Sequence, residues 1–250
     1  MHRFFLSLTL YFFLLSCTTI SPTPRLGIQD AYRSYVPART AVLPCQVWLS
    51  TSNFPAHPRS NVRDEDLKEP CRELDDYILL SFDAQPFMKG FTPKALGKFL
   101  VEAKKQSLMD VLASFFRYDP ELCEDCQDIA MFYNESVKVR DEWRQWLRSF
   151  SEATHESDAL LLPIFAFAWE DRENDRGLML SKRALGVTLL LVDVETAQLI
   201  WVGGRRTTHS TQAFANATQG EFPEFPPWTK LWERILIEDL WRQYPGRIIL

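Results

Sequence analysis

The chain has 250 residues, of which 46% are hydrophobic and 24% are charged, and its formal net charge is −5. This composition is typical of one globular domain, alone or with appendages, and it excludes a disordered chain, a collagen-like repeat and a protein with several membrane spans. The acidic balance also argues against a nucleic-acid partner, because proteins that bind the phosphate backbone normally carry a basic surplus.

The first residues have the pattern of a secretory signal. A basic start at 1–3 is followed by an uncharged apolar stretch over 4–15 and the small residue Ser16. That stretch is shorter than the about 20 apolar residues that a permanent transmembrane helix needs. Residues 14–17, Leu-Leu-Ser-Cys, resemble the bacterial lipobox, in which cleavage precedes a cysteine whose thiol receives a diacylglyceryl group.

The lipobox resemblance implies that residues 1–16 are removed and that Cys17 is lipidated and anchors the chain. Thr18 follows the cysteine. In Gram-negative sorting an Asp at that position retains a lipoprotein in the inner membrane, so Thr18 favours the outer membrane. We expect residues 17–36 to form a flexible tether and residues 37–250 to form a single periplasmic domain. The alternative is a coincidental cysteine beside an ordinary signal or an uncleaved anchor.

Export would place the other four cysteines, Cys45, Cys71, Cys123 and Cys126, in an oxidising compartment. Four cysteines allow three connectivities, and the sequence does not choose among them. Their local spacing makes Cys45–Cys71 together with Cys123–Cys126 the first expectation.

The Cys123-Glu-Asp-Cys126 spacing also occurs in thiol–disulfide enzymes and in zinc sites. A redox cysteine needs a lowered thiol pKa, whereas the acidic Glu124 and Asp125 would raise the pKa of the two thiols. Structural zinc would need two more ligands at matching spacing, and the histidines are scattered. A structural disulfide or inert thiols are therefore favoured, and we expect neither a metal nor a cofactor.

In the first half of the chain, a β-rich run over 40–44 predicts a first buried strand. The polar, proline-containing residues 50–76 predict a long loop, part of an insertion around 46–140. Thr92-Pro93 has the pattern of a helix N-cap and first turn, and predicts a helix that runs toward Phe115. A second helix carries an apolar stripe beside an arginine face, formed by Val139, Trp143, Trp146, Leu147 and Phe150 next to Arg140, Arg144 and Arg148.

The last part of the chain predicts three strands and then a helix. In chain order we expect a strand over 160–169 with an edge position or bulge at Pro163, a charged turn over 171–177, strands over 184–192 and 198–208 joined by a turn at 193–197, a loop over 210–228, and a helix from Thr229 that buries Trp232, Ile235, Leu236 and Leu240.

Three aromatic residues, Phe222, Phe225 and Trp228, alternate with prolines in the predicted loop. Such a loop can expose apolar surface with little entropy to lose, so these side chains are a candidate contact with a protein partner. The alternative, which is slightly favoured, is that the rings cover the core.

The order of these motifs carries a resemblance. After the lipobox come a strand ending in Val42-Leu43-Pro44, a helix leading into 158–162, a hairpin with Asp193, Thr196 and Trp201, and a final helix. This order resembles the α/β domain shared by the curli-secretion lipoprotein CsgG, the N-terminal domain of TolB and the peptidoglycan-synthase-activating lipoproteins. Residues 158–244 match best, and within that superfamily the chain is most similar to a group of lipoproteins of about this size.

The resemblance implies an α/β (α+β) fold, a small mixed sheet with a long C-terminal β-hairpin flanked by helices, used for assembly rather than catalysis. The residues agree, because no GxSxG, HExxH or SxxK motif or Ser–His–Asp grouping stands out. We therefore expect a non-enzymatic cell-envelope lipoprotein that binds a protein partner or forms a homo-oligomer, in assembly or envelope maintenance. The alternatives are a thiol–disulfide enzyme that uses Cys123 and Cys126, or a peptidoglycan-binding module.

Overall fold

The computed structural model describes residues 27–28, 37, 39–45, 62, 65–83, 92–95, 102–116, 128–153, 157–214 and 221–245, and the description below concerns these residues. They form, in chain order, β1 (Gly27–Ile28), β2 (Arg39–Val42), α2 (Lys68–Asp83), β3 (Thr92–Ala95), α4 (Glu102–Phe115), α5 (Ile129–Phe132), η3 (Tyr133–Val137), α6 (Asp141–Ala153), β4 (Ala159–Asp175), β5 (Leu178–Asp193), β6 (Leu199–Phe214), α7 (Trp228–Glu233), η4 (Arg234–Leu240) and η5 (Trp241–Gln243).

The strands of the described residues make one mixed sheet of six strands in the order β1-β6-β5-β4-β2-β3. β2 runs parallel to both β3 and β4. The other neighbours, β4 with β5, β5 with β6 and β1 with β6, are antiparallel. The predicted mixed sheet with a long C-terminal hairpin and flanking helices is confirmed.

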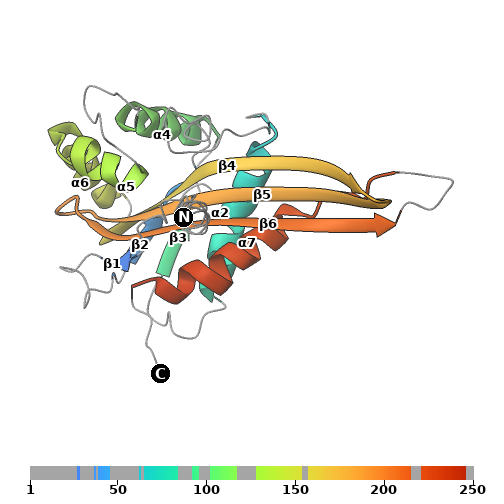
Figure 1. Cartoon of the computed structure of the whole chain (residues 1–250). Coiled ribbons are helices and arrows are strands. Elements are labelled where there is room, and N and C mark those ends of the chain that lie inside the picture. The colour runs from blue at the N-terminus through green and yellow to red at the C-terminus, as the bar shows by residue number, and fades with distance from the viewer. Residues whose placement is uncertain are drawn as a thin grey trace, which may run out of the picture.

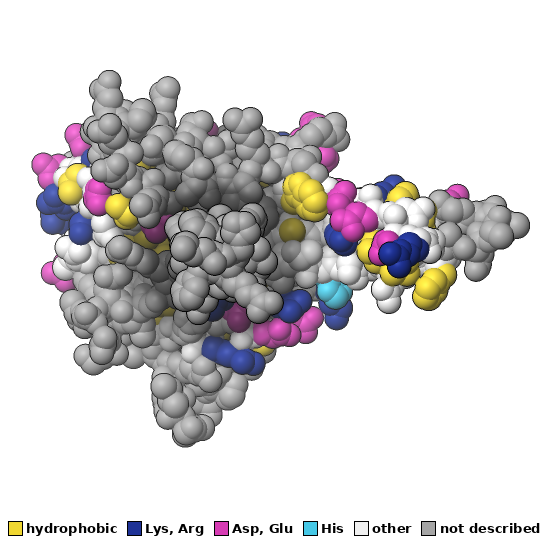
Figure 2. Space-filling view, viewed as in Figure 1, with side chains coloured by type: hydrophobic (Ala, Val, Ile, Leu, Met, Phe, Trp, Pro, Cys, Tyr) yellow, Lys and Arg dark blue, Asp and Glu magenta, His cyan; other side chains and the backbone are white. Residues whose placement is uncertain are grey.

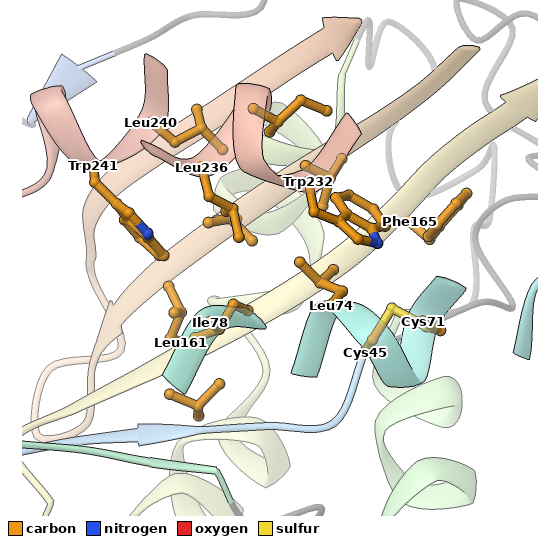
Figure 3. Packing of buried hydrophobic residues seen from close by; sticks show 14 of the residues in the cluster. Cys45, Cys71, Leu74, Ile78, Leu161, Phe165, Trp232, Leu236, Leu240 and Trp241 are labelled. Atoms are coloured by element: carbon orange, nitrogen blue, oxygen red, sulfur yellow. A yellow bond between two sulfur atoms is a disulfide. The ribbon is translucent and has the colours of Figure 1, made fainter. Parts of the chain in front are cut away.

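Helices cover both faces of this sheet (Figure 1). On one face, α2, α7 and η4 bury a cluster that includes Leu74, Trp232 and Leu236 against Leu161 and Phe165 of β4 (Figure 3). On the other face, α4, α5 and α6 bury a second cluster, with Trp143 and Leu147 among its members. Strand residues alternate between the two clusters, because successive side chains of a strand point to opposite faces.

The C-terminal hairpin forms as predicted but with longer arms. At the turn between β5 and β6, Asp193 Oδ1 accepts hydrogen bonds from Thr196 N and Thr196 Oγ1, each at 2.7 Å. The predicted charged turn at 171–177 is wrong for most of its length, because β4 continues to Asp175 and only Arg176 and Gly177 turn, with φ of 51° and 87°. β6 likewise continues to Phe214, into the predicted loop.

The helix α2 lies where a loop was predicted over 50–76. Leu74 and Ile78 are fully buried in the first cluster, and they have helical spacing with Cys71. Pro70 made this stretch look irregular, but a proline is tolerated in the first turn of a helix because the N–H that it lacks would have no partner there. Two hydrogen bonds tie α2 to the C-terminal helices, from Trp232 Nε1 to Pro70 O at 3.0 Å and from Trp241 Nε1 to Ser81 Oγ at 2.7 Å.

The predicted helix start at Thr92-Pro93 is also wrong. Residues 92–95 form β3, which pairs with β2 at the edge of the sheet, and the helix that follows, α4, begins at Glu102. A proline is accepted in an edge strand, because one side of that strand needs no ladder hydrogen bonds. Pairing with β2 therefore overrides the local capping pattern.

The apolar stripe predicted for the second helix is buried only in part. Trp143 and Leu147 are fully buried, whereas 54% of Val139 is exposed, because α6 begins at Asp141 and Val139 lies in the preceding turn. Trp143 Nε1 donates to Tyr133 Oη at 3.0 Å, and Tyr133 Oη donates to Ala197 O at 2.8 Å. These two bonds link α6 and η3 to the hairpin turn.

The disulfide Cys45–Cys71 is present, with a Cα–Cα distance of 5.4 Å, and it joins the end of β2 to α2 within the first cluster (Figure 3). The prediction for this pair is confirmed. Cys17, Cys123 and Cys126 lie outside the described residues. Among the described helices, none combines the length and the apolar character needed to cross a membrane.

Candidate functional site

Three strands of the sheet extend beyond the helices that cover its centre (Figure 1). We call this part the blade: residues 169–175 of β4, 178–184 of β5 and 208–214 of β6. Its register is continuous, from the row Trp169–Ala184–Thr208 to the row at its tip, Asp175–Leu178–Phe214. At about 3.3 Å per residue, the blade is roughly 20 Å long.

The two faces of the blade differ in what covers them. The first face continues the side that α2 and α7 cover, and its residues Met179 and Ser181 are buried. The second face, which we call the open face, continues the side that α4 and α6 cover. It exposes 40% of Trp169 and 80% of Phe214.

The segment 221–228, which we call the strap, lies against the first face. Its sequence is Glu-Phe-Pro-Glu-Phe-Pro-Pro-Trp, and its prolines hold φ near the value of an extended polyproline backbone. Its carbonyl groups accept hydrogen bonds from the blade: Ser181 Oγ donates to Pro223 O at 2.6 Å, Arg183 Nη1 donates to Pro226 O at 2.9 Å, and Thr211 Oγ1 donates to Glu224 O. The strap is therefore attached to the blade through its backbone.

Two arginines of the blade also contact the aromatic rings of the strap. Arg183 Cζ lies 4.1 Å from the ring centroid of Trp228 and 5.3 Å from that of Phe225. Arg172 Cζ lies 4.9 Å from the centroid of Phe225 and 5.7 Å from that of Phe222. These distances are within the range in which a guanidinium is attracted to the face of an aromatic ring.

Arg183 is the centre of this arrangement. Its Nε donates to Glu170 Oε1 at 2.6 Å, in addition to its contacts with the strap. On the neighbouring helix α2, Glu73 Oε2 is buried without a hydrogen-bond partner in the structure. Burial raises the pKa of the Glu73 carboxyl above its ordinary value, the negative charge of Glu69 raises it further, and the positive charge of Arg183 opposes the rise.

The three predicted contact residues differ in exposure. Trp228 is 5% exposed and belongs to the first cluster, so its ring covers the core. Phe222 and Phe225 are half-buried, between the blade arginines and solvent. A contact of these two rings with a partner stays a prediction.

Sequence reasoning missed the residues of the blade that hold the strap. Arg172 lies in the stretch interpreted as a charged turn, and Ser181 and Arg183 precede the predicted start of the second strand. Alternation is a signal that could have found them, because Glu170, Arg172 and Asn174 on one face alternate with acidic residues on the other. Because residues 170–176 are so rich in charge, this two-residue alternation of a strand was not recognised in the sequence.

The described residues offer little to a metal ion, since no group of three or more His, Cys, Asp or Glu side chains in them is placed to hold one. Two carboxylates of the blade are paired with cations: Glu170 pairs with Arg183, and Glu173 pairs with Lys182. These two ion pairs join β4 to β5 within the blade.

No protein-family model matches the chain, and no curated protein matches it. Solved structures with a similar course of the chain include the PelC dodecamer from Paraburkholderia phytofirmans, with 9% identity, a TM-score of 0.32, and coverage of 84% of this chain and 89% of that chain. Another is the lipoprotein GNA1162 from Neisseria meningitidis, with 12% identity, a TM-score of 0.33, and coverage of 81% and 97%.

A third similar structure is a neuraminyllactose-binding hemagglutinin homolog from Helicobacter pylori, with 8% identity, a TM-score of 0.39, and coverage of 91% of this chain and 95% of that chain. Each of these TM-scores is below 0.5, so the likeness carries no argument about the activity, partners or assembly of the chain.

Proposed function

We propose that the chain is a non-enzymatic cell-envelope lipoprotein, anchored in the outer membrane through Cys17, whose periplasmic domain acts through protein–protein contacts in assembly or envelope maintenance. Its partner is another envelope protein or a further copy of the chain. The signal pattern over 1–17 supports the anchor, and Thr18 supports the outer membrane.

The blade is the observation that carries the assembly role. It extends past the helices with an open face, and β1 pairs with β6 only near its start, at Trp201 and Val202. Beyond Val202 no described strand covers that edge of β6. Unpaired strand edges are sites at which another chain can add, and evolution usually covers or blunts them when they have no such role. An extended sheet of this kind therefore supports a binding function.

The Cys45–Cys71 disulfide supports the location. It lies within the first hydrophobic cluster, where a bond between helix α2 and the end of β2 is protected from solvent. Disulfides of this kind form and persist in oxidising compartments such as the bacterial periplasm.

The anchor is tested by labelling cells with palmitate in the presence and absence of globomycin, which blocks the lipoprotein signal peptidase. We expect label in the wild-type chain, accumulation of an unprocessed labelled precursor with globomycin, and no label in Cys17→Ser. If the wild type and Cys17→Ser are processed equally and neither carries label, the lipoprotein assignment is wrong.

The assembly role is tested by crosslinking in the native envelope with identification of the partners. We expect a discrete set of envelope proteins or the chain itself. A disulfide-exchange activity of the purified chain that is lost when Cys123 and Cys126 are both replaced by alanine would show instead that the chain is an enzyme. Retention of the chain on purified peptidoglycan, with no protein crosslinks, would show a glycan-binding module.

A further inference from the structure

The two outer edges of the blade are protected to different degrees. β4 contains Pro163, a bulge between Phe165 and Phe167, and a stretch from Glu170 to Asp175 in which every residue except Asn174 is charged. Proline, bulges and charges are the devices by which natural proteins prevent an edge strand from pairing with another chain. The β4 edge is thus protected against the addition of a strand from another chain.

From Thr207 to Phe214 the β6 edge lacks these devices. The stretch Thr207–Phe214, Thr-Thr-His-Ser-Thr-Gln-Ala-Phe, contains no proline, glycine, lysine, arginine or carboxylate. Its register with β5 is unbroken over its whole length. On its outer side, β1 pairs only with Trp201 and Val202, so no described strand covers the edge from Gly203 to Phe214. Figure 1 shows β6 as one border of the projecting part.

The side chains of this edge are complementary to themselves. On the open face, Arg206 and Phe214 lie four positions before and after Ser210, while Thr208 and Gln212 lie two positions before and after it. If two copies pair antiparallel about an axis at Ser210, Arg206 of each copy lies opposite Phe214 of the other, and Thr208 lies opposite Gln212. Directly opposite side chains share a face and lie about 5 Å apart.

This pairing would remove two features of the isolated chain. Phe214, of which 80% is exposed, would acquire a guanidinium over its ring, which is a favourable contact for an aromatic side chain. On its outer side, β6 would form the ladder hydrogen bonds that no described strand provides beyond Val202, in a sheet that joins the two blades. The paired strands would also keep the Arg205–Arg206 pairs of the two copies at opposite ends, so that like charges do not meet.

We infer that the β6 edge, residues 206–214, is a strand-addition site for a second copy of this chain, which pairs antiparallel with its two-fold axis at Ser210. This inference rests on the proposed assembly function and names one of its partners. The pairing uses one strand from each copy, and a shared membrane anchor would favour it by raising the effective concentration of the two edges.

The side chains of the open face favour a strand-edge contact over packing of one blade face on another, because Asp171, Glu173, Asp175 and Lys182 lie on it. On the side that Figure 2 shows, the described residues of the projecting part, at the right of the view, are charged and polar with scattered hydrophobic ones. Face-to-face packing of two sheets needs a broad apolar patch, whereas strand addition depends mainly on main-chain hydrogen bonds.

The test uses two full-length chains with different affinity tags, expressed together and purified from detergent-solubilised membranes. We expect the wild-type chains to co-purify. Ser210→Lys in both chains places two positive charges at the axis and should lower co-purification about fivefold, and Ser210→Glu in both should do the same. A Ser210→Lys chain with a Ser210→Glu chain should recover the wild-type level, because only a two-fold contact brings position 210 opposite itself.

Asp175→Lys on the β4 edge is the matched control, and it should leave co-purification unchanged. Arg206→Ala is a second variant, which should lower co-purification without adding charge. Urea midpoints equal to that of the wild type will show that each variant is folded.

Absence of wild-type co-purification, or insensitivity to Ser210→Lys, would overturn the inference. Two results together would show that β6 pairs head-to-tail with β4, and they would overturn the inference too. The Ser210→Lys chain would co-purify with the Ser210→Glu chain no better than with another Ser210→Lys chain, and Asp175→Lys would lower co-purification. If the inference is overturned but the chain still crosslinks to other envelope proteins, the proposed assembly function holds and only the β6 dimer is excluded.

Discussion

Arg183 should be the side chain that holds the strap on the blade, and Arg183→Ala tests this. The substitution removes the hydrogen bond to Pro226 O at 2.9 Å, the ring contact with Trp228 at 4.1 Å and the ion pair with Glu170. A hydrogen bond from a charged group contributes about 1.5–3 kcal/mol, and a cation–π contact contributes about 0.5–2 kcal/mol. The partly exposed ion pair adds about 0–1 kcal/mol.

Since these contributions are not additive, we expect Arg183→Ala to lower the free energy of unfolding by roughly 2–4 kcal/mol. Urea unfolding followed by circular dichroism measures this loss. Hydrogen exchange at the strap amides of Glu224, Phe225 and Trp228 should also become faster, because the strap loses its central contact. Exchange in α6, on the other face of the sheet, should stay close to that of the wild type.

Arg172→Ala is the matched control, because Arg172 touches two strap rings, at 4.9 and 5.7 Å, from an exposed position. It should cost only about 0.5–1 kcal/mol. Equal losses for the two variants, or an Arg183→Ala chain with unchanged exchange in the strap, would refute the assignment of Arg183 as the central contact.

Three further variants test the core and its electrostatics. Replacing both Cys45 and Cys71 by alanine should lower the free energy of unfolding, measured in urea, by about 3.5 kcal/mol, since a sequence separation of 26 gives a loop-closure term of this size. Gly203→Ala should cost about 1–3 kcal/mol, because a Cβ there would overlap the buried ring of Trp201. Glu73→Gln should raise stability at pH 7, as measured by urea unfolding, and the gain should vanish at pH values below 4.5.

The sign for Glu73 follows from its protonation. The folded state raises the pKa of this carboxyl above 4.5, so the folded chain binds the proton more tightly than the unfolded chain does. The stability that the protonated carboxyl contributes is therefore fully present below pH 4.5. It is lost as the pH rises through the pKa that Glu73 has in the folded chain. If the stability of the Glu73→Gln chain depends on pH in the same way as that of the wild type, this reasoning is contradicted. Glu195→Gln, at an exposed turn, serves as the control.

The other two predictions have controls of their own. A reducing agent should destabilise the wild type more than the chain without Cys45 and Cys71, in which only a Cys123–Cys126 bond could still be reduced. Equal effects on both would contradict the contribution of the Cys45–Cys71 disulfide. Gly177 has a φ of +87° and open space around an added Cβ, so Gly177→Ala should cost only the backbone strain, about 1 kcal/mol. A Gly203→Ala chain no less stable than Gly177→Ala would mean that the ring of Trp201 can move.

The elements that could be predicted are those with an unbroken local pattern. The final helix buries Trp232, Ile235, Leu236 and Leu240 as their spacing predicts, and the hairpin turn forms at Asp193. The helix α2 was missed because a polar composition and Pro70 concealed the spacing of Leu74 and Ile78, which becomes meaningful only beside the sheet.

The strap could not be predicted as an attached element, because each of its contacts joins residues far apart in sequence. Arg183 and Pro226 are separated by 43 positions, and Ser181 and Pro223 by 42. An arginine in a charged stretch has the same local pattern whether it faces solvent or an aromatic ring. Only the register of β4, β5 and β6 places it under the strap.

The sequence alone predicted a secretory signal and a lipobox at Cys17, favoured a Cys45–Cys71 pair by local spacing, and carried the alternation that makes the C-terminal hairpin. These are local properties, set by residues within a few turns or by side-chain period. Tertiary structure decided that 92–95 is a strand, that 68–83 is a helix, and which face of the blade is covered. Those outcomes depend on which surfaces meet, because burial against a distant partner outweighs local propensities that differ by only about 1 kcal/mol per residue.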